Sequence, residues 1–442
     1  MNKTWWPSMA LVGAVAVGIS SYWLSESAQA EPTQLKAPRD VVWKDFLGVN
    51  AHFLWFTPQQ YRQQMERYKA LGLEWTRVDL HWDRHEPKED QYQLAVIDEL
   101  VNTLKDEKLK SVFYLVGSAP HATTAPANSK TPDQYPPKDP KVFAERMYML
   151  AKRYPSVNAW QVWNEPNLPS FWRPHEDAKG YGALLQVSTQ ALRQAYPDKP
   201  VIMGGMAYYS QMPVKGGLMI EELGKLGVQQ LKVVAAYHPY SQEPEGDDVK
   251  ARDFVLRAQQ LNGMLRGAKL PGIWATEWGW SSYQGPKELQ RIIGDSGQAD
   301  YTLRRLALMS ALDYDKVFLF ALSDLDSRAT PRDRHYGLLD LQGQPKPVYT
   351  ALQRFLKIAG ARLKPADAPA LSQVPSDLFA VSWKRDDGKN LWMFWSASGA
   401  QLHLPKVTDA VLHDPLKGTE RPVKASDGVR FNAAPTLQML VW

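Results

Sequence analysis

The chain of 442 residues contains no cysteine. This absence excludes disulfide bonds, thiolate zinc sites and a cysteine nucleophile. The formal net charge is only +5 and no lysine–arginine block with interleaved aromatic residues is present, so we expect no nucleic-acid partner. Two motifs are also missing, a glycine-rich phosphate loop after a strand and the G-x-S-x-G elbow of serine hydrolases. We expect neither a cofactor nor a bound metal.

Long apolar runs are confined to the N-terminus. Lys3 precedes an apolar run at 9–19, and an Ala-Gln-Ala sequence ending at Ala30 fits a cleavage site. Together they predict a signal peptide over residues 1–30. The alternative is an uncleaved membrane anchor, because residues 4–25 carry no charge and are long enough to span a bilayer. Either interpretation predicts an exported protein, periplasmic or associated with the inner membrane.

Short apolar runs alternate with amphipathic stretches from about residue 45 to residue 360. The predicted strands are 46–53, 73–80, 110–119, 158–165, 200–206, 231–237, 272–278 and 316–324. The stretches between them carry apolar residues three and four apart, which predicts helices at 61–71, 94–108, 141–154, 183–196, 219–226, 253–265, 300–314 and 348–358. Eight such units predict a (β/α)8 TIM barrel, an α/β fold. A doubly wound sheet is the alternative.

The pattern changes after Gly360. Residues 361–370 are rich in proline and alanine, and two β-prone runs follow, joined by a D-D-G-K turn at 386–389 that is typical of a hairpin. We therefore predict a signal peptide or anchor at 1–30, the barrel at 31–360 and a small C-terminal β-sandwich domain at 361–442. Packing against the barrel is the first interpretation of this domain, and carbohydrate binding is the second.

Two glutamates stand at the ends of predicted strands. Glu165 ends the fourth strand and Glu277 ends the seventh. In a (β/α)8 barrel these strands lie across from one another, and the active site forms at their C-terminal ends. One protonated and one ionised carboxyl group at such a site are what cleavage of a glycosidic bond requires. The alternative is a pair of structural ion-pair partners.

The two motifs around these residues resemble those of the retaining glycoside hydrolases of clan A. WNEP at 163–166 resembles the strand-four motif of the clan, and ATEWG at 275–279 resembles its strand-seven motif. The resemblance implies that Glu165 is the general acid/base, that Asn164 binds the sugar, and that Glu277 is the nucleophile. The trailing β domain is similar to that of family 39.

Further residues are predicted to bind substrate. The resemblance implies an arginine beside the nucleophile and a tyrosine from strand six, and other aromatic and histidine side chains fall at the expected barrel mouth. The candidates are Arg77, Asn164, Tyr240, His52, Trp82, His121, His238 and Trp278. One departure concerns Phe320, because many clan members carry a tryptophan there. His81 and His85 have the spacing of metal ligands on a helix, but they lie in a proline-containing loop.

The resemblance also implies a polysaccharide substrate, an exopolysaccharide, and a monomeric enzyme. Large aromatic residues on the predicted mouth loops favour an open groove and cleavage within chains: Trp55, Trp82, Tyr135, Phe171, Trp172 and Tyr283. The alternative function is a non-hydrolytic polysaccharide-binding component of an exopolysaccharide synthesis or export system.

Overall fold

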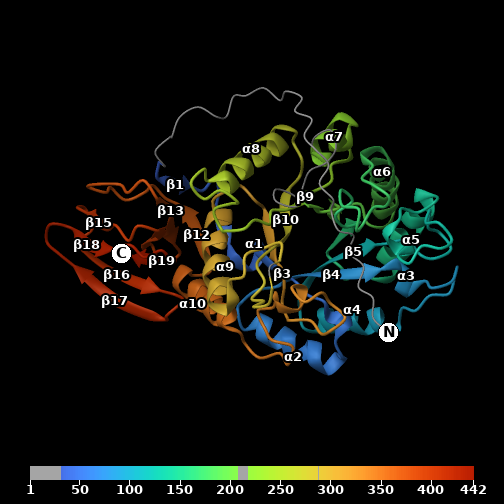
Figure 1. Cartoon of the computed structure of the whole chain (residues 1–442), viewed down its shortest axis with the longest axis horizontal. Coiled ribbons are helices and arrows are strands. Elements are labelled where there is room, and N and C mark those ends of the chain that lie inside the picture. The colour runs from blue at the N-terminus through green and yellow to red at the C-terminus, as the bar shows by residue number, and fades with distance from the viewer. Residues whose placement is uncertain (1–30, 208–217, 287) are drawn as a thin grey trace.

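The computed structural model describes residues 31–207, 218–286 and 288–442, which form a barrel and a β domain side by side (Figure 1). The predicted signal segment lies outside these residues. No helix in the described part of the chain is both long enough and apolar enough to cross a membrane.

Nine parallel strands form the barrel. They are β3 (Leu47–Asn50), β4 (Trp75–His81), β5 (Lys110–Val116), β6 (Ala159–Val162), β7 (Val201–Met203), β8 (Met206–Ala207), β9 (Ala235–His238), β10 (Ile273–Trp278) and β11 (Lys316–Leu319). β7 and β8 are two pieces of one barrel strand. β11 pairs with β3, and a bridge between Ile202 and Val234 joins β7 to the chain entering β9. The ring is therefore closed, and the predicted (β/α)8 barrel is confirmed.

Helices surround this ring and follow its strands. They are α2 (Pro58–Lys69), α4 (Ala95–Asp106), α5 (Pro140–Arg153), α6 (Ala178–Ala195), α7 (Met219–Lys225), α8 (Asp253–Gly267), α9 (Gly294–Ser310) and α10 (Pro347–Ala359). Shorter helices are α1 (Trp43–Phe46), α3 (Trp82–His85), and the 3-10 turns Phe53–Trp55, Pro132–Gln134, Val228–Leu231 and Asp333–His335. Local sequence sets the helix starts. At α2, for example, Thr57 as the N-cap residue and Gln60 in the first turn form a capping box.

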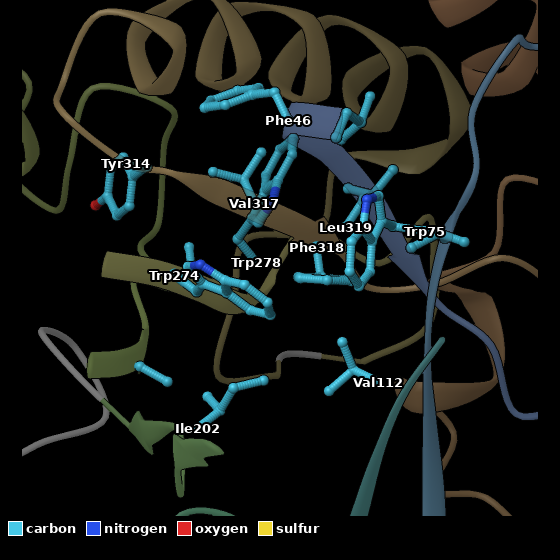
Figure 2. Packing of buried hydrophobic residues seen from close by; sticks show 14 of the residues in the cluster. Phe46, Trp75, Val112, Ile202, Trp274, Trp278, Tyr314, Val317, Phe318 and Leu319 are labelled. Atoms are coloured by element: carbon cyan, nitrogen blue, oxygen red, sulfur yellow. The ribbon is translucent and has the colours of Figure 1, made fainter. Parts of the chain in front are cut away.

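Aromatic side chains fill the end of the barrel where the strands begin (Figure 2). The Trp274 ring lies 6.0 Å from the Trp75 ring and 5.8 Å from the Phe318 ring, measured between centroids. Gly48 of β3 leaves room for this packing, because a Cβ atom there would lie 2.5 Å from Phe318. The polar side chains come later along the strands, so they gather at the opposite end.

The β domain is built on one large sheet, ordered β17-β16-β19-β14-β13-β12-β2, with β1 added against β13. Its strands are β1 (Thr33–Lys36), β2 (Val41–Val42), β12 (Arg362–Pro365), β13 (Leu378–Arg385), β14 (Asn390–Ser396), β16 (Asp409–Asp414), β17 (Thr419–Lys424) and β19 (Gln438–Val441). A second sheet pairs β15 (Gln401–Leu404) with β18 (Val429–Asn432). We call both sheets together the β-module. Although β1 and β2 fall in the range predicted for the barrel, the structure places them in this module.

Strand β13 shows how the module packs. Phe379, Val381 and Trp383 belong to the core shared with the barrel, whereas Leu378 and Ala380 belong to a separate core that includes residues of β15 and β18. This alternation is the two-residue period of a strand buried on both faces. The large sheet therefore lies between the barrel and the small sheet, as the predicted β-sandwich requires.

Candidate active site

An unusual backbone turn presents Glu165. Strand β6 ends at Val162, after which Trp163 has a φ of 71° and Glu165 a φ of 41°. Few residues other than glycine adopt this left-handed region, and such residues often occur at functional sites. The Glu165 amide donates to the Gly205 carbonyl at 3.0 Å, which ties the turn to the next barrel strand. The Glu165 side chain is thereby held at the strand ends with only 7% of the residue exposed.

Glu277 reaches the same point from β10. One carboxylate oxygen of Glu165, one of Glu277 and a ring nitrogen of His238 all lie within 4.8 Å of one another. Glu277 is also 7% exposed. The structure therefore brings together the two glutamates that the sequence placed at strand ends four and seven.

Arg77 of β4 organises the floor of this site. Its Nη1 donates to Glu277 Oε1 and to Asn50 Oδ1, each at 2.7 Å. Its Nη2 donates to Asn164 Oδ1 at 2.7 Å, and its Nε donates to Gln161 Oε1 at 2.8 Å. The guanidinium thus fixes the orientation of four neighbours at once, and its side chain has no exposed surface.

His238 lies between the two glutamates. Its Nδ1 is 2.8 Å from Glu165 Oε1 and 3.6 Å from Glu277 Oε2, and its Nε2 is 3.0 Å from Thr276 Oγ1. Burial lowers the pKa of His238 to about 4, so the ring is neutral at pH 7. Gly205 makes room for the ring, because a Cβ atom there would lie 2.0 Å from His238 Nε2.

Burial has the opposite effect on Glu165. It raises the pKa of this carboxyl group to about 8, although the charges of Arg77 and Arg332 oppose the shift. Glu165 is therefore protonated at neutral pH. A raised carboxyl pKa beside a second carboxylate is the arrangement that general acid catalysis uses.

Glu277 has a different environment. Besides the Arg77 contact, its Oε2 accepts a hydrogen bond from the Tyr240 hydroxyl at 3.3 Å. Burial raises the pKa of Tyr240 well above its usual value, so this phenol remains a donor. One donor on each oxygen orients the Glu277 carboxylate.

The group of Glu165, His238 and Glu277 also has the spacing of metal ligands. However, Arg77 already places a positive charge 2.7 Å from Glu277. A divalent cation would have to sit beside this guanidinium, which Coulomb repulsion disfavours. The geometry fits a proton-transfer site better than a metal site.

Comparison with known proteins adds the family. Residues 35–308 match the family described as Cellulase, glycosyl hydrolase family 5. The chain belongs to this family. It is thus a glycoside hydrolase of clan A, as its two glutamate motifs predict. No curated protein matches the chain.

Solved structures show where else this fold occurs. A family 39 glycoside hydrolase from Bacteroides cellulosilyticus WH2 is 20% identical, with a TM-score of 0.69 over 92% of this chain and 82% of that one. A monomeric beta-xylosidase from Caulobacter crescentus CB15 is 16% identical, with a TM-score of 0.62 over 93% and 99%. A family 30 endoxylanase from Clostridium papyrosolvens C71 is 10% identical, with a TM-score of 0.61 over 93% and 99%. At these identities the likeness concerns the fold.

Two of the tryptophans predicted to bind substrate in this glycoside hydrolase are deeply buried. Trp82 is 2% exposed, packs edge-on against Phe143 and donates to Glu86 Oε2 at 2.6 Å. Trp278 has no exposed surface and packs among the core residues (Figure 2). Neighbouring side chains cover both rings as completely as they cover Arg77 and His238, and the substrate contacts of Trp82 and Trp278 stay predictions.

His52, His121 and Phe320 lie at the mouth and are only partly buried. The His52 ring meets the Phe320 ring edge-on, with centroids 5.2 Å apart. Phe320 follows β11, at the position where the sequence departs from the clan pattern. Both ring nitrogens of His121 are buried without a hydrogen-bond partner among the described residues.

Sequence reasoning did not find Asn50 and Gln161. Both are buried, and both accept hydrogen bonds from Arg77. Asn50 also donates to the Thr276 carbonyl at 3.0 Å, which links the first barrel strand to the seventh. A polar residue inside an otherwise apolar strand is the signal that could have marked them, since an unpaired amide there is costly.

The six aromatic residues predicted to line an open groove divide into two groups. Trp82 and Trp172 are buried, at 2% and 3% exposure. The other four are partly exposed: Trp55, Tyr135, Phe171 and Tyr283. They come from loops after four different barrel strands, so several sides of the mouth carry an accessible ring.

Proposed function

We propose that this chain is a retaining, endo-acting glycoside hydrolase that cleaves an exopolysaccharide by double displacement. Glu165 is the acid/base and Glu277 is the nucleophile. The observation that carries the proposal is the unequal environment of two carboxyl groups whose oxygens approach within 4.8 Å. Glu165 holds a proton at neutral pH, whereas Glu277 contacts a guanidinium.

In the first step, Glu277 attacks the anomeric carbon. Arg77 and Tyr240 each hold one of its oxygens, which orients the carboxylate before substrate arrives. Glu165 donates its proton to the departing glycosidic oxygen, so the leaving sugar departs as an alcohol. The product of this step is a covalent glycosyl–Glu277 ester.

In the second step, Glu165 acts as a base. Now ionised, it accepts a proton from water as the water attacks the ester, and Glu277 leaves as a carboxylate. We propose the tautomer of the neutral His238 that carries its proton on Nδ1, which lies 2.8 Å from Glu165 Oε1, while Nε2 lies 3.0 Å from the Thr276 hydroxyl. This leaves the other Glu165 oxygen to carry the catalytic proton.

The spacing supports retention of anomeric configuration. Retaining enzymes place the two carboxyl groups about 5–5.5 Å apart, whereas inverting enzymes need about 6.5–9.5 Å to admit a water molecule. Oxygens within 4.8 Å fit the shorter class. Proton NMR of the first-formed product tests this point, and an inverted anomer would contradict it.

The substrate assignment rests on other features. Four partly exposed aromatic rings around the mouth suit a polysaccharide that occupies several sugar subsites. Each ring that covers the apolar face of a sugar removes apolar area from water. Among proteins with this fold, one is described as an endoxylanase and another as a monomeric beta-xylosidase. We propose internal cleavage by a monomer. We propose a Psl-like exopolysaccharide as the substrate, because the chain length, the predicted export signal and the motifs together resemble those of the glycosidase of the Psl exopolysaccharide system. The predicted export signal also favours a periplasmic or inner-membrane location.

The test begins with release of reducing ends from exopolysaccharide by purified protein. Activity supports hydrolysis, whereas binding without release would support the alternative of a non-hydrolytic component. Endo cleavage predicts a rapid fall in polymer size, and monosaccharide release with little change in size would contradict it.

Variants of the two glutamates test the assigned catalytic roles. Glu277→Gln should abolish turnover. Glu165→Ala should be rescued by azide on a substrate with an activated leaving group. Azide rescue of a Glu277 variant would reverse the assignment.

A further inference from the structure

One tryptophan of the β-module hydrogen-bonds a buried carboxylate of the barrel. Trp395 of β14 has its indole ring stacked on Phe379, with centroids 5.6 Å apart. Its Nε1 donates to Glu245 Oε1 at 2.8 Å. Glu245 belongs to the segment that follows barrel strand β9, and it has no exposed surface. A side chain of the β-module therefore holds a buried carboxylate of the barrel.

Helix α9 completes this connection. Arg304 Nη1 donates to the same Glu245 Oε1 at 2.7 Å, and Arg304 Nε donates to Asp300 Oδ2 at 3.0 Å. The Leu437 backbone, which belongs to the β-module, hydrogen-bonds Asp300. The module thus contacts this network at two places, Trp395 and Leu437.

The next residue of α9 fixes the rest of the segment. Arg305 donates from Nη1 to the Pro239 carbonyl at 2.6 Å and from Nε to the Pro244 carbonyl at 2.7 Å. It also donates from Nη2 to Ser241 Oγ and to the Glu243 carbonyl. Arg305 is fully buried, so these contacts do not compete with bulk water. We call residues 239–245 the positioning loop.

Tyr240 stands inside this loop, and its hydroxyl donates to Glu277. We propose that Trp395 is a positioning residue for the active centre: by fixing Glu245 it holds the positioning loop, and the loop holds Tyr240 against the nucleophile. The β-module is then a working part of the catalytic unit rather than a separate carbohydrate-binding domain. This inference rests on the proposed function and adds a residue remote from the reacting atoms.

Two other module tryptophans provide a contrast. Trp383 and Trp392 are also fully buried, yet their indole nitrogens have no hydrogen-bond partner in the described ranges. Trp392 lies in the separate core beneath the small sheet. Its replacement should disturb packing without touching the positioning loop, which makes it a matched control.

The kinetic test compares Trp395→Phe with Trp392→Phe on an aryl glycoside that the wild type hydrolyses. Trp395→Phe should lower kcat about fivefold and change KM by less than about twofold, because orientation of the nucleophile is lost while substrate contacts remain. Trp392→Phe should leave kcat unchanged. In a Tyr240→Phe background, Trp395→Phe should add no further loss, since both changes act through the same contact.

Hydrogen exchange gives a readout that does not depend on activity. In Trp395→Phe, backbone amides of the positioning loop should exchange faster, while those of β10 should not. If Trp395→Phe does not fold, Glu245→Gln tests the same link from the barrel side. Equal kinetics and equal loop exchange in Trp395→Phe and Trp392→Phe would overturn the inference. A wild type that hydrolyses nothing would instead refute the proposed function, while loop exchange would still decide the link.

Discussion

The active centre and the interface between barrel and β-module each contain a buried cluster of carboxyl groups and an arginine, and the difference between these two clusters locates the chemistry. In the interface cluster, Arg304 pairs with both Glu245 and Asp300, and Trp395 adds a second donor to Glu245. In the active-centre cluster, Arg77 pairs with Glu277, while the described partner of Glu165 is the neutral His238. Both clusters contain two carboxyl groups, but only the interface cluster gives each of them a guanidinium.

Burial raises the pKa of Glu245, Asp300 and Glu165 alike. At the interface the paired Arg304 acts against this effect, whereas Glu165 has no such direct ion pair with an arginine in the described part of the chain, and its pKa reaches about 8. Arg332 and Asp333 both act on Glu165, but with opposite signs, and they pair with each other at 3.4 Å. A missing cation in a buried site is thus what leaves a proton available for catalysis.

Replacing Arg77 or Arg304 by lysine should lower activity by very different amounts in the two clusters. Arg77→Lys removes the fork that orients Glu277 and Asn164 together, so kcat/KM should fall about 10³-fold. Arg304→Lys makes the same change in the interface cluster and should cost less than about tenfold. Initial rates of the two variants measure both losses of kcat/KM. Similar losses would contradict the claim that only the arginine beside Glu277 takes part in catalysis.

Stability should respond in the interface cluster. Arg304→Met leaves Glu245 without its cation, so the free energy of unfolding should fall by about 3 kcal/mol. The control is Arg153→Met, which breaks the exposed pair with Asp98 and should cost less than about 1 kcal/mol. Denaturant unfolding measures both. Equal losses would mean that burial does not strengthen the interface pair.

The buried carboxyl group of Glu165 should reduce the stability of the fold at alkaline pH. Between the unfolded pKa of 4.5 and the folded value of about 8, the unfolded chain releases the Glu165 proton while the folded chain retains it. Raising pH through this window therefore favours unfolding.

Glu165→Gln removes this penalty, so its Tm should exceed that of the wild type by about 3 °C at pH 8, and by less at pH 4. Glu66→Gln, at an exposed helical position, is the control. A Tm difference that is independent of pH would contradict the explanation. Calorimetry at the two pH values provides the measurement.

The sequence predicted those features that depend on local pattern. Short apolar runs predicted the barrel strands, and apolar residues three and four apart predicted the helices. The motifs at two strand ends predicted Glu165 and Glu277. What it could not predict depends on partners far along the chain. β1 pairs with β13, across more than three hundred residues, and Asn50 contacts Arg77 only because β3 and β4 are neighbours. Trp278 looked accessible because its covering residues come from other elements.

The central claim is that Glu165 carries the catalytic proton at neutral pH. The pH dependence of kcat/KM on two glycosides tests it most directly, one with a poor leaving group and one with an activated leaving group. For the poor leaving group, the rate should decline about tenfold per pH unit above about pH 8, as Glu165 loses its proton. For the activated leaving group, which needs no proton, this decline should be absent. The same decline for both glycosides, or a decline for the poor leaving group that begins near pH 4.5, would contradict the assignment.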